Sequence, residues 1–233
     1  MLDRLKDLFT GSNSGARSTP PVAASNGRIA TQQDRRTSPP VPVPRQSNGL
    51  DQFFSILRDR GSLSVLDLAG ASQDNISYIT SMSHRLASED FVRSMEMTFG
   101  DDPLGNQADP VLVDQFVSEN LTFAPDSFDG VLAWDALQFL TPHLLQLTVD
   151  RLYEAMRPGC CLLAFFNSDE KSRELVRYHY RIADHKTLNL LPRGQAAVGQ
   201  PFNNRSIEKL FHRYESVKFF LARDHLREII VRR

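Results

Sequence analysis

Three short apolar segments constrain the fold of this chain more than any other feature. Residues 160–166 (CCLLAFF) are apolar without a break, and residues 130–134 (GVLAW) and 64–68 (SVLDL) are shorter segments of the same kind. A strand with one face in water alternates apolar and polar residues, whereas a parallel strand covered on both faces is apolar throughout. The three segments are therefore predicted to be buried strands of a layered α/β fold.

Segments with helical spacing of apolar residues lie between these strands. Helices are predicted over residues 50–60, 75–82, 110–116, 142–156 and 206–214. Further strands are predicted over residues 85–88, 117–121, 175–182, 187–191, 217–221 and 226–231. Strands joined by helices predict a Rossmann-like, mostly parallel open sheet with helices on both faces, closed by a C-terminal antiparallel hairpin.

The first 49 residues differ in composition from the rest of the chain. Residues 11–49 contain no aromatic residue and six of the 13 prolines. Residues 1–49 carry a net charge of +4, whereas residues 50–233 carry −5. Such a segment cannot bury enough apolar surface to offset chain entropy. Residues 1–49 are therefore predicted to be a disordered tail rich in Pro, Ser and Arg, and residues 50–233 to be the folded domain.

Two parts of this tail leave alternatives open. Residues 2–9 have apolar side chains on one helical face, which suits either a short docking helix for a partner or membrane surface, or a frayed terminal helix. Residues 39–44 (PPVPVP) favour an extended polyproline conformation, which suits either an aromatic-lined groove of a partner or a plain spacer.

Composition and charge exclude several classes of protein. The net charge of −1 and the pI of about 6.6 give no indication of nucleic-acid binding. Apolar runs of only a few residues exclude a membrane-spanning helix, which needs about 20, and the first residues lack the apolar core of a secretory signal. Cys160 and Cys161 exclude a disulfide framework and suit a reducing, cytoplasmic location. The six histidines show no metal-ligand spacing, so no metal site is expected.

Candidate binding residues follow the predicted parallel strands. In such a sheet, ligands bind at the carboxyl ends of the strands. Asp67 to Ser72, Glu89 with Asp90, and Trp134 with Asp135 all lie at such ends. A carboxylate there suits the hydroxyls of a ribose, and a loop of small residues before a helix N-terminus lets the backbone approach a nucleoside.

Three segments together resemble the class I S-adenosylmethionine-dependent methyltransferases. They are residues 65–71 (VLDLAGA), 128–140 (FDGVLAWDALQFL) and 152–159 (LYEAMRPG). Their order and spacing are similar to the first motif, the fourth-strand segment and the Pro-Gly turn before the fifth strand in that family. The resemblance implies S-adenosylmethionine as the cofactor and methyl transfer to a small-molecule or macromolecular acceptor that the sequence does not identify.

The resemblance also implies roles for individual residues. Asp67 and the backbone of Ala69, Gly70 and Ala71 would hold the methionine part of the cofactor. Glu89 or Asp90 would bind the ribose hydroxyls. Trp134 and Asp135 would border the methionine and the entrance for the acceptor. The sequence indicates no catalytic nucleophile–base pair.

The loop departs from the family pattern, and this keeps a second hypothesis open. Ala69, Ala71 and Gln73 stand where the family has glycines, and the bulkier Gln73 is expected to reach toward the cofactor. A catalytically inactive methyltransferase-like domain, used for binding or scaffolding, is the alternative function. A nicotinamide-dependent oxidoreductase would need a G-x-G-x-x-G loop, which residues 69–74 do not supply.

Overall fold

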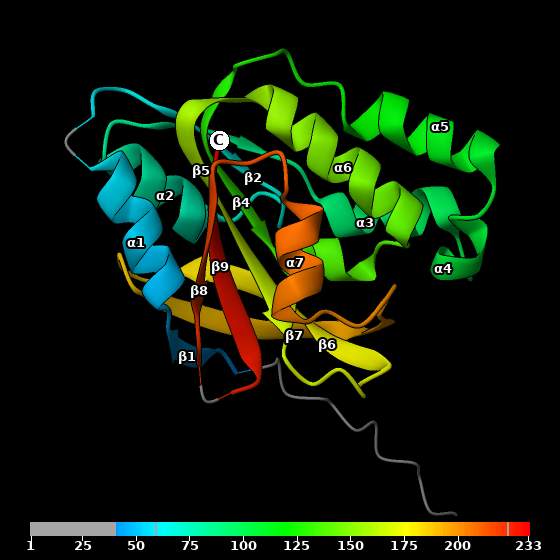
Figure 1. Cartoon of the computed structure of the whole chain (residues 1–233). Helices are drawn as coiled ribbons and strands as arrows, with labels where there is room; N and C mark the ends of the chain where they lie inside the picture. Colours follow the sequence, from blue (N-terminus) through cyan, green and yellow to red (C-terminus); the bar gives the residue numbers. More distant parts are fainter. Residues whose placement is uncertain (1–40, 59, 223) are drawn as a thin grey trace, which may run out of the picture. The chain divides into compact units, whose positions relative to one another are not determined.

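The parallel strands form as the apolar segments predict. The computed structural model describes residues 41–58, 60–222 and 224–233. Its main sheet has the order β3 (Arg85–Ser88), β2 (Ser64–Asp67), β4 (Phe128–Trp134), β5 (Met156–Asn167), β9 (Leu226–Arg232) and β8 (Ser216–Phe220). The first four strands are parallel, and β9 is antiparallel to both of its neighbours. The predicted open α/β sheet with a C-terminal antiparallel hairpin is therefore confirmed (Figure 1).

Helices cover both faces of this sheet, and each face has its own hydrophobic core. The helices are α1 (Asn48–Leu57) and α2 (Gln73–Ser81) on one face, and α3 (Phe91–Phe99), α5 (Pro110–Asn120), α6 (Pro142–Ala155) and α7 (Asn204–Leu210) on the other. In β5, Cys161, Leu163 and Phe165 pack on the α1 side, and the alternate residues pack on the α6 side. Burial on both sides explains why this strand is apolar throughout.

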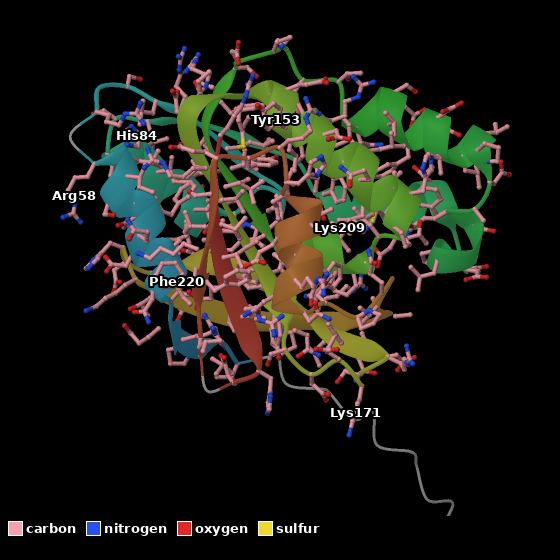
Figure 2. All side chains as sticks on the ribbon, viewed as in Figure 1. Arg58, His84, Tyr153, Lys171, Lys209 and Phe220 are labelled. Atoms are coloured by element: carbon pink, nitrogen blue, oxygen red, sulfur yellow. The ribbon has the colours of Figure 1, made fainter. Side chains whose placement is uncertain are left out.

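Two labelled aromatic residues mark the two cores in Figure 2. Tyr153 of α6 packs against the core on the α6 side of the sheet, and Phe220 of β8 packs against the core on the α1 side. Two short elements complete the α6 side, α4 (Pro103–Asn106) and the 3-10 helix η1 (Ala136–Phe139). In the part of the chain that the structure describes, no helix has both the length and the apolar character needed to cross a bilayer.

A second, three-stranded sheet lies at the carboxyl end of the parallel strands (Figure 1). It consists of β1 (Val43–Gln46), β7 (Thr187–Ala197) and β6 (Glu174–Ile182), all antiparallel. The hairpin of β6 and β7 confirms the two strands predicted over residues 175–182 and 187–191. Its position decides what the functional site can do, because it packs on the ends of β2 and β4.

The folded part begins earlier than predicted. Disorder was predicted through residue 49, but β1 pairs with β7, and Ser47 caps α1 by accepting a hydrogen bond from the Leu50 N–H. Gly49 is buried so tightly that a Cβ there would lie 2.8 Å from Glu228 Oε2. The composition misled because β1 is ordered by its pairing with β7 and not by apolar residues of its own. Residues 1–40, with the short helix predicted over residues 2–9, lie outside the described residues.

The strand predicted over residues 117–121 is also wrong. These residues form the last turn of α5 and its C-cap, Leu121. Val113 and Phe116 are the buried residues of α5, with the spacing of one helical face, and Leu121 is buried just beyond them. Val113, Phe116 and Val117 recur with the spacing of a helix, and the prediction of a strand over residues 117–121 overlooked this period.

Candidate functional site

Asp67, at the end of β2, is fully buried and hydrogen-bonded to other parts of the protein. Its Oδ1 accepts hydrogen bonds from the Ala69 N–H at 2.9 Å and from Trp134 Nε1 at 2.6 Å, and its Oδ2 accepts one from Asn75 Nδ2 at 2.8 Å. Burial raises the pKa of Asp67, and these three hydrogen bonds lower it in part. The carboxylate therefore joins β2, β4 and α2, and it offers little to a ligand in this arrangement.

Asn75 joins the β6–β7 hairpin to the loop that follows β2 through hydrogen bonds. Its Nδ2 also donates to the Tyr180 carbonyl oxygen at 3.0 Å, and its Oδ1 accepts from the Ile182 N–H at 2.8 Å. Asn75 and Ile79 are the two buried residues of α2, one turn apart. Sequence reasoning missed Asn75, although a polar residue on the apolar face of a helix was a signal for a buried hydrogen bond.

Trp134, at the end of β4, is enclosed by the hairpin. It is 1 % exposed, and its ring stacks on Tyr180 with centroids 4.9 Å apart and planes 5° apart. Its φ of +50° is rare for a bulky residue and turns the indole back toward Asp67. The space in front of β4, where the resemblance places the methionine, thus holds the side chain of Tyr180.

Asp90, at the end of β3, lies beside the loop after β2, and its carboxylate is ion-paired. Gly70 donates its N–H to the Glu89 carbonyl oxygen at 3.1 Å, and its φ of +86° suits glycine alone. Asp90 caps α3 through the Arg93 N–H, and both of its oxygens bind Arg193, at 3.0 and 3.2 Å. Glu89 is exposed.

A β-bulge explains how Arg193 reaches Asp90. Opposite Arg177 and Tyr178 the register of β6 and β7 shifts, with Gly194 and Pro192 as the partners and Arg193 as the extra residue. Bulges often redirect a side chain near a functional site. No local sequence signal identifies Arg193 as the partner of a residue 103 positions away.

The loop itself borders a small cavity of about 310 Å³. The cavity lies between residues 69–74 and residues 179–181 of β6. Gln73 is one of the residues that line it, and its amide donates to Ser77 Oγ at 2.9 Å along α2. β6 narrows the crevice from the other side.

Asp135 is a buried acid that forms no ion pair among the described residues, and the Tyr180 hydroxyl lies beside it. It is 6 % exposed and follows Trp134 directly. Burial raises the pKa of Asp135 to about 7, an effect that the nearby Tyr180 hydroxyl, Arg177 and Arg193 reduce. Asp135 and Tyr180 line a larger cavity of about 580 Å³ between the two sheets.

The structure thus brings the predicted residues to one edge of the main sheet, from the ends of β2, β3 and β4. Asn75, Tyr180 and Arg193 hold the β6–β7 hairpin at this edge. Among the described residues, no group of three or more His, Cys, Asp or Glu side chains is arranged to hold a metal ion.

No model of a protein family and no curated protein matches this chain. Similar solved structures are S-adenosylmethionine-dependent methyltransferases, the family that the sequence resembles. One is the 1,6-didemethyltoxoflavin-N1-methyltransferase of Burkholderia thailandensis with bound 1,6-didemethyltoxoflavin and S-adenosylhomocysteine (12 % identity, 79 % of this chain, 76 % of that chain, TM-score 0.44). Another is a methyltransferase from Mesorhizobium loti (13 % identity, 78 % of this chain, 96 % of that chain, TM-score 0.44). Likeness at this level concerns the fold, and function has to be argued from side chains.

Proposed function

We propose that this chain is an S-adenosylmethionine-dependent methyltransferase whose cofactor crevice is covered by its own β6–β7 hairpin. The acceptor would bind in the 580 Å³ cavity beside Asp135. The observation that carries the proposal is the buried carboxylate of Asp135, which forms no ion pair among the described residues and borders a cavity at the end of β4. Such a group is costly to bury and is a candidate for function where it borders a cavity.

The residues present fit only part of the cofactor in the arrangement described. The backbone of residues 69–71 borders free space, but Asp67, Asp90 and Trp134 are engaged by other side chains. Binding of the whole cofactor therefore requires the hairpin to move away from the ends of β2 and β4. When bound, S-adenosylmethionine would supply an electrophilic methyl group.

The residues of this chain would prepare the acceptor. Asp135 can take a proton from an acceptor O–H or N–H group, and a pKa of about 7 suits a general base at neutral pH. Tyr180 belongs to the hairpin that moves, so its hydroxyl lies beside Asp135 and lowers the pKa of that carboxyl only in the closed arrangement. Positioning of the acceptor would supply much of the rate.

The hairpin gives a testable consequence at Arg193. Replacing Arg193 with alanine removes the ion pair with Asp90, and we expect S-adenosylhomocysteine to bind about three- to tenfold more tightly because the binding-competent form becomes more populated. Isothermal titration calorimetry measures this. The control is Arg181→Ala on the same hairpin, since Arg181 is half-exposed and approaches Asp74 only at 3.7 Å. Equal or weaker binding by the Arg193 variant would count against a covering role for the hairpin.

A catalytically inactive binding module is the second candidate. The carboxylate of Asp67 favours it, because three hydrogen bonds from the protein already hold its oxygens. In that case the hairpin is a permanent part of the fold. The same titration separates the two candidates, because an inactive module would give no heat with S-adenosylmethionine or S-adenosylhomocysteine at millimolar concentration, in the wild type or in Arg193→Ala.

One further feature belongs to the proposal. The two thiols, which are buried and unpaired in the structure, suit a cytoplasmic location.

A further inference from the structure

The 580 Å³ cavity contains a buried hydroxyl without a partner of good geometry. Tyr180 is 2 % exposed, and its hydroxyl forms no hydrogen bond of normal geometry in the described part of the chain. It lies beside the Asp135 carboxylate, which is 6 % exposed and forms no ion pair with those residues. Buried polar groups are nearly always hydrogen-bonded, so this hydroxyl and the unpaired carboxylate next to it leave room for a polar group of a ligand.

Charge around the cavity favours a positively charged partner. Asp135, Glu174 and Asp224 supply three carboxylates to its wall, and Arg45 supplies the one guanidinium. That guanidinium is already ion-paired with Asp224 and with Glu228, which lies behind it. The wall therefore has an excess of negative charge that its own residues do not neutralise.

The other cations near Asp135 also have carboxylate partners. Arg177 is paired with Glu96 through Nη1, while its Nε has no partner in the described part of the chain. Arg193 is paired with Asp90. Both lower the pKa of Asp135 from a distance, but burial still outweighs them. His225, at the turn before β9, is the remaining titratable group of the wall. An anion would meet the unpaired carboxylate directly, so phosphates and carboxylic acids are disfavoured as ligands.

Aromatic rings complete the wall. Tyr178 and Tyr180 both border the cavity, with ring centroids 6.3 Å apart and planes at 68°. The faces of such rings attract ammonium groups, and their apolar surface suits a hydrocarbon stem. Tyr178 is only partly buried, so it lies toward the open side of the cavity.

We propose that this cavity binds a small organic cation, with an ammonium group held by the Asp135 carboxylate and the Tyr180 hydroxyl and its hydrocarbon part against Tyr178. As the class of acceptor, an amine would rest on the proposed function. Binding of the cation itself needs no cofactor and stands independently of methyl transfer.

Three probes of equal size test this inference on the full chain at pH 8. They are benzylamine, benzyl alcohol and benzoate, which differ in charge at one position. We expect benzylamine to bind at least tenfold more tightly than either other probe in a calorimetric or NMR titration. Equal binding of the three probes, or preference for benzyl alcohol or benzoate, would overturn the inference. Preference for benzyl alcohol would indicate that Asp135 acts in its protonated form.

Two variants locate the binding. Asp135→Asn keeps the shape but removes the charge and should weaken benzylamine binding at least tenfold, whereas Tyr180→Phe should weaken it about threefold. Glu170→Gln, at an exposed position outside the cavity wall, should leave binding unchanged. Circular dichroism verifies that each variant folds, and unchanged binding in both cavity variants would reject the site.

Failure of this inference is distinguishable from failure of the proposed function. Binding of S-adenosylhomocysteine without binding of benzylamine would remove the cation site and leave the methyltransferase proposal in place. Binding of benzylamine without S-adenosylhomocysteine would do the opposite and favour the inactive binding module.

Discussion

Replacing Glu228 with glutamine should lower the free energy of unfolding by about 3 kcal/mol, the lower end for breaking a buried ion pair on one side. Glu228 is 2 % exposed on β9. One of its oxygens binds Arg45, and the other accepts hydrogen bonds from Ser47 Oγ at 3.0 Å and from the Gly49 N–H at 2.6 Å. A glutamine amide has no good acceptor for its N–H groups at Gly49, and it leaves the Arg45 charge less compensated.

Thermal unfolding measures this effect, with an expected decrease in Tm of about 6–12 °C for a domain of this size. Glu215→Gln is the matched control, because Glu215 is exposed and its side chain forms no ion pair or hydrogen bond among the described residues. It should change the free energy of unfolding by less than about 0.5 kcal/mol. An equally small effect of Glu228→Gln would show that the segment around β1 contributes nothing to the folded domain.

The same anchor changes the expectation for truncation. A fully disordered tail through residue 49 would allow deletion of residues 1–49 without loss of stability. Because Arg45, Ser47 and Gly49 bind Glu228, that deletion should destabilise the domain at least as much as Glu228→Gln. Deletion of residues 1–40 leaves this anchor intact.

Asp135→Asn should stabilise the protein at pH 8 by up to about 4 kcal/mol and have little effect at pH 4. Burial raises the pKa of Asp135 from 3.8 to about 7. The folded state therefore holds this proton more tightly than the unfolded state. Its contribution to stability is fully present below pH 3.8 and is lost as the pH rises toward 7. Asparagine is neutral throughout and avoids this loss.

Urea denaturation of both proteins from pH 4 to pH 8 measures the difference between them. Groups that titrate in both proteins cancel in this difference, including Asp67, whose pKa burial also raises. Asp114→Asn, at an exposed position of α5, is the control for loss of a surface carboxylate, and it should change the free energy of unfolding by less than about 0.5 kcal/mol. A constant difference for Asp135→Asn would mean that this carboxylate is hydrated or hydrogen-bonded in the folded protein.

Much of the fold could be predicted because the composition of a strand reflects how many of its faces are buried. A parallel strand such as β5 is apolar at every central position, and helices such as α6 begin with Thr-Pro and repeat apolar residues on one face. The start of the domain was missed because the order of β1 depends on a partner about 140 residues away. Composition describes what a segment can do alone, and β1 is not ordered alone.

The location of the candidate site was predictable, but the contacts of its residues were not. Parallel strands end at one edge, so Asp67, Asp90, Trp134 and Asp135 had to lie near one another. Whether these side chains face a ligand or the protein depends on where the hairpin packs. Nothing local to Tyr180 indicates that its ring covers Trp134, because this contact joins segments that are distant in the sequence.

The amide of Ile182 reports whether the hairpin covers the crevice and moves when the cofactor binds. In the closed arrangement this N–H donates to Asn75 Oδ1 at 2.8 Å. Hydrogen exchange at saturating S-adenosylhomocysteine should be faster at Ile182 than in the free protein, while the amide of Leu163 in the centre of β5 stays equally protected. Failure of S-adenosylhomocysteine to bind, or binding with Ile182 as protected as before, would contradict the account.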